Sequence, residues 1–281
     1  MATGCNSSTV TTAQTAIERF WDDCQFSGPV TVAGYELYRI RLNTLSAEAR
    51  DALAASIEHH CLEPMVFRRV RGGDALARSL EARLPSRGDD AVARRDRGGD
   101  LGELLAIEWL RRHGQDLWEV CFTLRWKESI RPRRGEDIVA IDWDQNPVGL
   151  LKGEAKAAES IGADTIQNAR ARLDQDGGWP APFTIDFLAE RLAREGREQE
   201  AGRLYVERFV NMPRPQDPGC THLLFLFSAD DPENRVVTHG RVAATAGRPQ
   251  LAAILVHEGY VAFRDGMHAR AIELARQRGQ Q

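Results

Sequence analysis

Lysine is scarce in this sequence. Only Lys127, Lys152 and Lys156 are lysines among its 37 basic residues, and arginine supplies the rest. Arginine keeps its proton in proteins, whereas lysine is a compact cation whose pKa responds to its surroundings. A lysine at position 156 therefore suggests a site that distinguishes the two cations.

Membrane and disulfide features are also lacking. No apolar run is long enough to cross a bilayer, and the start Met1–Ser8 lacks the charged and apolar segments of a signal peptide. We therefore expect a cytoplasmic protein without a membrane partner. The five cysteines are widely spaced and form no Cys-x-x-Cys pair, which argues against a disulfide framework or a structural zinc site. They are Cys5, Cys24, Cys61, Cys121 and Cys220.

The composition is that of a globular protein with no bulk affinity for nucleic acid. Its 281 residues are 42% apolar and 28% charged, enough for one sizeable core and an accessory region. The net charge of −4 argues against coating DNA through bulk electrostatics. Any contact with DNA must therefore be local.

Hydrophobic patterning predicts an α/β protein with a mixed central sheet flanked by helices. An N-terminal α/β accessory region is expected over residues 1–95, with helices over 11–20, 46–61 and 74–84 and strands over 29–42 and 65–70. Residues 86–99 mix Gly, Asp and Arg without periodicity, which predicts a loop and a module boundary.

The second region, residues 96–281, carries the regular pattern of a core. A helix is predicted from Asp100, as its N-cap, to His113. Strands over 118–126, 136–143 and 148–156, a helix over 161–173, a helical insertion at about 180–212 and a buried strand over 221–228 follow. Helical patterns around 250–257 and over 266–278 end the chain.

Three residues of this core can form a reactive cluster. Because side chains alternate along a strand, Glu154 and Lys156 project from the same face. An antiparallel hairpin across the turn after residue 143 brings Asp137 beside Glu154. Two such carboxylates favour a divalent cation between them, and Mg²⁺ or Mn²⁺ prefers oxygen ligands. A neighbouring ammonium can orient a water or stabilise charge on a phosphoryl group, so the cluster fits phosphodiester hydrolysis.

Gly135-Glu136-Asp137, followed by Glu154-Ala155-Lys156 between two helices, resembles the PD-(D/E)xK nuclease superfamily. The resemblance covers about residues 100–173 and the later strand. It implies a restriction-endonuclease-like core in which Asp137, Glu154 and the Ala155 carbonyl hold Mg²⁺ or Mn²⁺ while Lys156 serves the attacking water. Glu136 stands where the family name has proline, a common departure.

Glu103 on the first helix occupies the position where many members place a further glutamate near the metal. The resemblance therefore implies a catalytic role for Glu103. Asp100-x-x-Glu103 is equally a capping box, in which both side chains satisfy free amides at a helix start. Both interpretations stay open.

The chain is similar to the HamA-type nuclease subunits of Hachiman anti-phage defence systems in its length, its N-terminal extension and two short motifs, at residues 134–139 and 152–156. That similarity implies a helicase partner. The sequence contains no Gly-x-x-x-x-Gly-Lys-Ser/Thr phosphate loop, so ATP-driven handling of DNA must come from another chain.

Local basic residues are candidates for DNA contact. Arg131, Arg133 and Arg134 precede the metal strand, and Lys152 shares the face of Glu154. The alternatives are a solvated turn for the arginines and a strand-edge charge in water for Lys152.

The reactive cluster predicts a Mg²⁺-dependent deoxyribonuclease, and the similarity to HamA-type subunits implies that it acts as a defence effector. Two alternatives remain. One is an inert partner-binding or regulatory module on the same fold, and the other is a restriction-type site-specific endonuclease.

Overall fold

A computed structural model describes residues 17–62, 72–85, 88, 90–113, 118–120, 136–211, 220–240 and 247–278. The predicted strand over 65–70 and most of the strand over 118–126 lie outside these residues. So do Arg131, Arg133 and Arg134.

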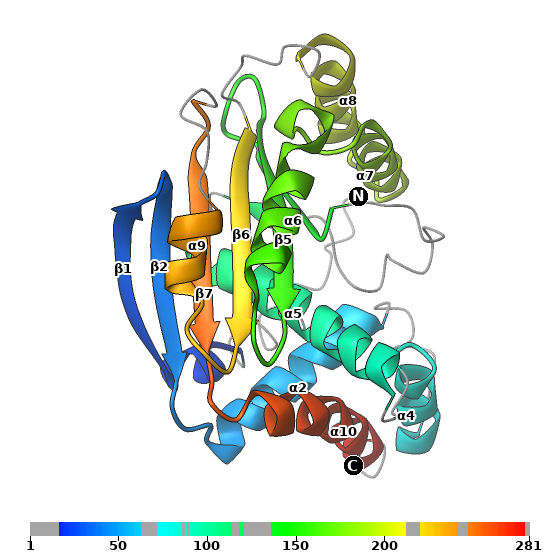
Figure 1. The fold of residues 1–281 in the computed structure, drawn as a ribbon. Helices are drawn as coiled ribbons and strands as arrows, with labels where there is room; N and C mark the ends of the chain where they lie inside the picture. Colours follow the sequence, from blue (N-terminus) through cyan, green and yellow to red (C-terminus); the bar gives the residue numbers. More distant parts are fainter. Residues whose placement is uncertain are drawn as a thin grey trace.

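A seven-stranded mixed sheet organises the fold, in the order β1-β2-β7-β6-β5-β4-β3 (Figure 1). The strands are β1 (Cys24–Val32), β2 (Tyr35–Leu42), β3 (Glu119–Val120), β4 (Ile138–Asp142), β5 (Gly149–Ala157), β6 (Cys220–Ser228) and β7 (Gln250–Val256). The four central strands β2, β7, β6 and β5 are parallel, and antiparallel pairs extend the sheet at both edges. The predicted α/β class with a mixed sheet is confirmed.

One face of the sheet packs on the larger group of helices. These are α2 (Ala47–Cys61), α4 (Gly73–Glu81), α5 (Ala91–His113) and α10 (Tyr260–Arg278). Their apolar side chains form one core with Leu151, Phe225 and Leu255 from β5, β6 and β7, all of which are fully buried. Leu224 and Leu226 of β6 are buried on the opposite face, so β6 is covered on both sides and reads as a nearly continuous apolar run.

The other face is covered by α6 (Ala163–Asp174) and α9 (Glu233–His239), which lie in front of the sheet in Figure 1. The predicted insertion is α7 (Pro182–Arg194) and α8 (Glu198–Val206), reached through the short turn η2 (Gln175–Gly178) and followed by η3 (Glu207–Asn211). It packs on Val139, Ile141 and Leu150 of β4 and β5. No helix within the described ranges is both long and apolar enough to span a membrane.

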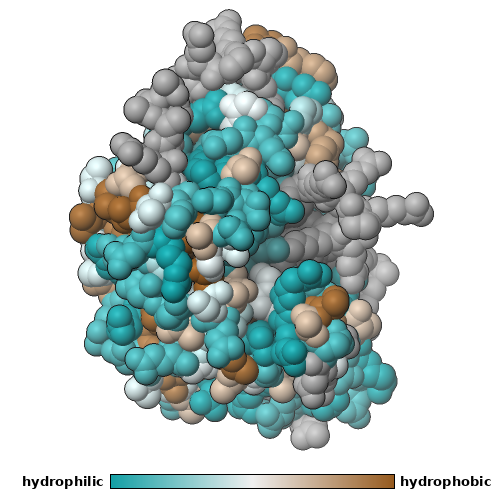
Figure 2. All heavy atoms as spheres, in the orientation of Figure 1, coloured by the Kyte–Doolittle hydropathy of each residue, from teal (hydrophilic) through white to brown (hydrophobic). Residues whose placement is uncertain are grey.

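Most of the surface in Figure 2 is hydrophilic, with apolar side chains gathered where α8 lies. The exposed large apolar residues of α8 and η3 are Tyr205, Val206, Phe209 and Val210. The edge strand β1 exposes Phe26 and Val30. Arg208, whose guanidinium lies 5.1 Å from the ring centre of Phe209, borders the first group.

Residues 250–256 form a strand, so the helix predicted there is wrong. Gln-Leu-Ala-Ala-Ile-Leu-Val has alanines that favour a helix, but β7 inserts between β2 and β6 and pairs in parallel with both. Both of its faces are covered, and a strand buried on both faces shows no alternation that would distinguish it from a helix.

Helix α5 begins at Ala91, so the predicted loop over 86–99 is wrong from residue 91 onwards. The glycines that suggested a loop permit close packing instead. A Cβ on Gly102 would lie 2.8 Å from the Cβ of Ala157, and a Cβ on Gly98 would lie 2.7 Å from the hydroxyl of Tyr260. The boundary predicted at residues 95/96 falls inside α5, and β1 and β2 belong to the same sheet as the core strands. The division into two regions stays a prediction.

Candidate active site

The β4–β5 hairpin places the two acidic side chains of the predicted cluster together. Ile138 pairs with Gly153, so the next position along the antiparallel register sets Asp137 opposite Glu154. The Asp137 carboxylate accepts a hydrogen bond from the backbone N–H of Ala155 at 3.0 Å. Both acidic side chains are largely buried, with 15% of Asp137 and 4% of Glu154 exposed.

Lys156 lies against both carboxylates. Its ammonium donates to Glu154 Oε1 and lies 3.4 Å from Asp137 Oδ2. It also donates to the Ala155 carbonyl at 2.9 Å, the carbonyl that the resemblance implies as a metal ligand. With 24% of its side chain exposed, Lys156 reaches solvent as well as the acidic pair.

The electrostatics of the site favour a cation. Burial and the charge of Asp137 raise the pKa of Glu154, whereas Lys156 and Arg172 act in the opposite direction. Two acidic groups in a shared, largely buried space repel each other unless positive charge accompanies them. In the structure Lys156 and Arg172 supply that charge, and the oxygens of Asp137 and Glu154 are also the donors that a divalent ion would require.

Arg172 is part of this cluster, although no pattern in the sequence pointed to it. It lies in the last turn of α6, and its guanidinium donates to Glu154 Oε1 at 3.0 Å. The charges of Glu154, Asp137 and Glu103 raise its pKa. Half of the side chain is exposed, so it can reach an anionic ligand from solvent. In an arginine-rich chain, residue type provided no signal for this position.

Glu103 approaches the cluster from α5. The close contact of Gly102 with Ala157 holds this part of α5 against the end of β5. Glu103 is 8% exposed and affects the pKa of Arg172. The capping-box interpretation is wrong, because Asp100 and Glu103 lie in the middle of a helix that begins at Ala91.

The donors at the site fit a hard cation with a partial protein ligand set. Asp137 and Glu154 contribute carboxylate oxygens and Ala155 a carbonyl oxygen, the donor type that Mg²⁺ and Mn²⁺ prefer. Over the described ranges, no three His, Cys, Asp or Glu side chains come close enough to hold a metal ion. Mg²⁺ commonly keeps several waters, so an ion on two carboxylates and a carbonyl would leave positions for water and substrate oxygens.

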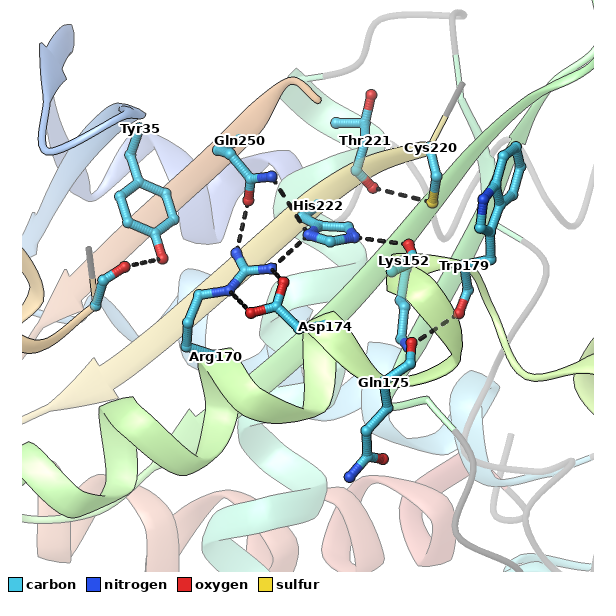
Figure 3. A network of polar contacts seen from close by, with 12 residues as sticks. Tyr35, Lys152, Arg170, Asp174, Gln175, Trp179, Cys220, Thr221, His222 and Gln250 are labelled. Atoms are coloured by element: carbon cyan, nitrogen blue, oxygen red, sulfur yellow. Dashed lines mark hydrogen bonds and ion pairs between the residues drawn. The ribbon is translucent and has the colours of Figure 1, made fainter. Parts of the chain in front are cut away.

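Lys152 does not present its charge to solvent. It is 3% exposed, and its ammonium donates to the carbonyls of Gln175 and Trp179, both at 2.9 Å (Figure 3). Glu136 Oε1 lies 3.7 Å away. The expectations of a strand-edge charge in water and of a phosphate contact by Lys152 are therefore corrected: its ammonium is held inside the protein.

The fold and the cluster together define an α/β protein with a carboxylate–lysine site where the antiparallel β4–β5 pair meets α6. A family model described as HamA matches residues 15–252, and the chain belongs to this family. No curated protein matches the chain. Membership in the HamA family fits a component of a Hachiman-type defence system, as the sequence predicted.

Proposed function

We propose that this protein is a metal-dependent nuclease that hydrolyses DNA phosphodiester bonds as the effector of a Hachiman-type defence system. The observation that carries the proposal is the convergence of Asp137, which directly precedes β4, with Glu154 and Lys156 of the adjoining strand β5. This combination of residues has the chemistry for phosphodiester cleavage. A PD-(D/E)xK type of active site accounts for all three.

Each residue has a separate task in this proposal. Asp137, Glu154 and the Ala155 carbonyl hold Mg²⁺ or Mn²⁺. When bound, the ion supplies a Lewis acid and lowers the pKa of a coordinated water. Lys156 orients the attacking water and stabilises negative charge that develops on the phosphate. Arg172, half exposed beside Glu154, binds a non-bridging phosphate oxygen.

DNA and a helicase are the proposed partners. In the sequence, Gly135 alone separates the arginine cluster from Glu136 and Asp137, which supports a role for this cluster in binding the phosphate backbone near the site: Arg131, Arg133 and Arg134. The lack of a phosphate-loop motif supports a separate ATPase chain.

The test is cleavage of plasmid and linear DNA by the purified protein with Mg²⁺, Mn²⁺ or a chelator. Glu154→Ala and Lys156→Ala each remove one role, and Arg194→Ala, at a side chain 75% exposed on α7, serves as the control. Metal-dependent cutting that both site variants lose and the control keeps would support the proposal. Cutting that survives in both variants would contradict it.

An inactive wild-type protein would favour the regulatory-module alternative. In that module, Lys156, Arg172 and Glu154 would form only a structural ion-pair network. The assay would then be repeated with the proposed helicase partner and ATP. Inactivity there as well would remove the nuclease proposal.

A further inference from the structure

The helical insertion α7–α8 is attached to the catalytic strands by buried polar contacts. The first is made by Glu136, the residue before Asp137. Its carboxylate accepts from the backbone N–H of Ala181 and from the hydroxyl of Thr184, both at 2.6 Å. Ala181 is the N-cap of α7 and makes no side-chain cap of its own. Glu136 therefore supplies the negative charge that a helix start favours.

The second contact is made by Lys152, two residues before Glu154 on β5. Its ammonium holds the carbonyls of Gln175 and Trp179 and thereby secures both ends of the turn that leads into α7 (Figure 3). The same ammonium neighbours Glu136. Glu136, Lys152 and their buried contacts thus link the segment before β4, strand β5 and the entry to α7.

The turn between α6 and α7 is itself firmly held. Gly178 has φ +82°, a left-handed backbone conformation that favours glycine. The Gly178 carbonyl accepts from His222 Nε2 at 2.7 Å, while His222 Nδ1 accepts from Arg170 at 2.6 Å (Figure 3). The turn cannot shift without breaking these buried bonds.

A third contact lies at the far end of the insertion. Glu207 of η3 is 2% exposed and accepts from the backbone N–H of Val148 at 2.9 Å. Val148 directly precedes β5. Both the beginning and the end of the insertion are therefore bonded to the strands that carry the acidic pair.

The contact between Glu136 and the start of α7 affects Asp137, because the two acidic residues are adjacent in the chain. The β4–β5 ladder begins at Ile138, so Asp137 lies just outside it, at a bend. Besides the contacts that Asp137 makes with Ala155 and Lys156, the anchoring of Glu136 fixes the chain at this point. A displacement of the start of α7 would move Glu136, and with it Asp137, because a single peptide unit joins the two residues.

We propose that Glu136 is a positioning residue that makes the placement of Asp137 opposite Glu154 depend on the α7–α8 insertion. The insertion is then a structural control element for the metal site. This inference rests on the proposed function, because it assumes that the acidic pair binds a divalent ion.

Thr184→Val tests the inference from the helix side, since it removes the hydroxyl donor but keeps the shape of a residue that is 1% exposed. We expect Mn²⁺ binding, measured calorimetrically without DNA, to weaken by about 10-fold, the usual scale for partners that orient metal ligands. The rate at saturating DNA should fall while KM stays unchanged. Thr184→Ser restores the hydroxyl and should restore binding.

Ile185→Val is the matched control, because it truncates the adjacent, fully buried residue of α7 without touching Glu136. It should lower stability yet leave Mn²⁺ affinity unchanged. Glu136→Gln probes the same contact from the strand side and replaces Thr184→Val if that variant does not fold.

The outcomes separate the two proposals. Wild-type Mn²⁺ affinity retained in both Thr184→Val and Glu136→Gln would overturn the positioning role and leave the nuclease proposal intact. Equal weakening in Ile185→Val would also overturn it, because loss of helix packing would then suffice. A wild-type protein that neither binds Mn²⁺ nor cuts DNA with its partner would overturn both.

Discussion

Lys156 combines two contacts that a guanidinium cannot easily reproduce. Its ammonium reaches Glu154 and the Ala155 carbonyl from the same strand, two residues and one residue away. A compact ammonium with rotatable donors fits this space, whereas the planar guanidinium of arginine is larger and directs its donors in a fixed fork. The distinction explains why a chain so rich in arginine has lysine here.

We predict that Lys156→Ala lowers the rate of DNA cleavage by about 100-fold or more, the scale for removing one preorganised electrostatic group. Lys156→Arg should not restore it, because charge without the ammonium geometry is insufficient. Single-turnover cleavage at saturating Mg²⁺ measures the effect. Full activity in Lys156→Arg would show that only the charge is needed.

Arg172 should act mainly on DNA binding. Arg172→Ala removes one half-exposed cation beside the acidic pair, so we predict weaker binding and a slope of log Kd against log salt that is smaller by about 1. Fluorescence anisotropy with metal-free protein measures this without cleavage. Arg194→Ala, at an exposed side chain of α7, is the control. An unchanged slope in Arg172→Ala would rule out a phosphate contact.

At the residue scale, local geometry made part of the site predictable. The alternation of a strand and the register of a hairpin are enough to bring Glu154, Lys156 and Asp137 together. Arg172 could not be predicted in this way, because its contact with Glu154 depends on how α6 packs across β5. Lys152 was placed on the right face, but its burial comes from the turn after α6.

At the scale of elements, strands and helices with clear periodicity or sharp boundaries were predictable. The strands β4, β5 and β6 and the helix α6 fall within one or two residues of their predicted bounds. β7 and the first turns of α5 were missed because tertiary packing overrides local preference there. Alanines in β7 fit a closely packed parallel sheet, and Gly98 and Gly102 fit a helix pressed against β5.

The Arg170–His222 network joins α6, β6 and β7, and it predicts a pH dependence of stability. Burial lowers the pKa of His222 from 6.5 to about 4. The charges of Arg170 and Arg248 also lower it, while the hydrogen bond to Gly178 acts in the opposite direction. The unfolded chain therefore takes up a proton at His222 at a higher pH than the folded protein does. The contribution of neutral His222 to the free energy of unfolding is therefore fully present above pH 6.5 and is lost as the pH falls towards 4.

We predict that this titration removes up to about 3 kcal/mol of unfolding free energy across that range. His222→Gln, which lacks the titrating group, should flatten the dependence, while His239→Gln at an exposed site should not. Urea denaturation at a series of pH values measures both. An unchanged profile in His222→Gln would assign the pH dependence to other groups.

At the scale of the whole molecule, one sheet runs from the N-terminal hairpin to the candidate site. β2 pairs with β7, which pairs with β6 and then β5. A buried hydrogen bond also joins α2 to α5, with His60 Nε2 2.5 Å from Glu108 Oε1. The N-terminal residues therefore share the fold of the site-bearing strands through main-chain bonds as well as packing.

This continuity predicts a single cooperative unfolding transition. Leu37→Ala in β2 and Leu151→Ala in β5 each empty a fully buried position and should each destabilise the protein by about 2–5 kcal/mol. Both should shift the same transition in far-UV circular dichroism and in calorimetry. Two transitions, of which Leu37→Ala moves only one, would instead support separate N-terminal and core domains.

The proposed function depends above all on Asp137 and Glu154 holding the ion that DNA cleavage requires. The most direct test titrates Mn²⁺ and measures binding and cleavage in the same samples of wild-type protein and Glu154→Gln. We expect half-maximal cleavage and half-saturation to fall at the same Mn²⁺ concentration, and Glu154→Gln to lose both. Cleavage that persists in Glu154→Gln, or that proceeds without bound metal, would contradict this role of the acidic pair.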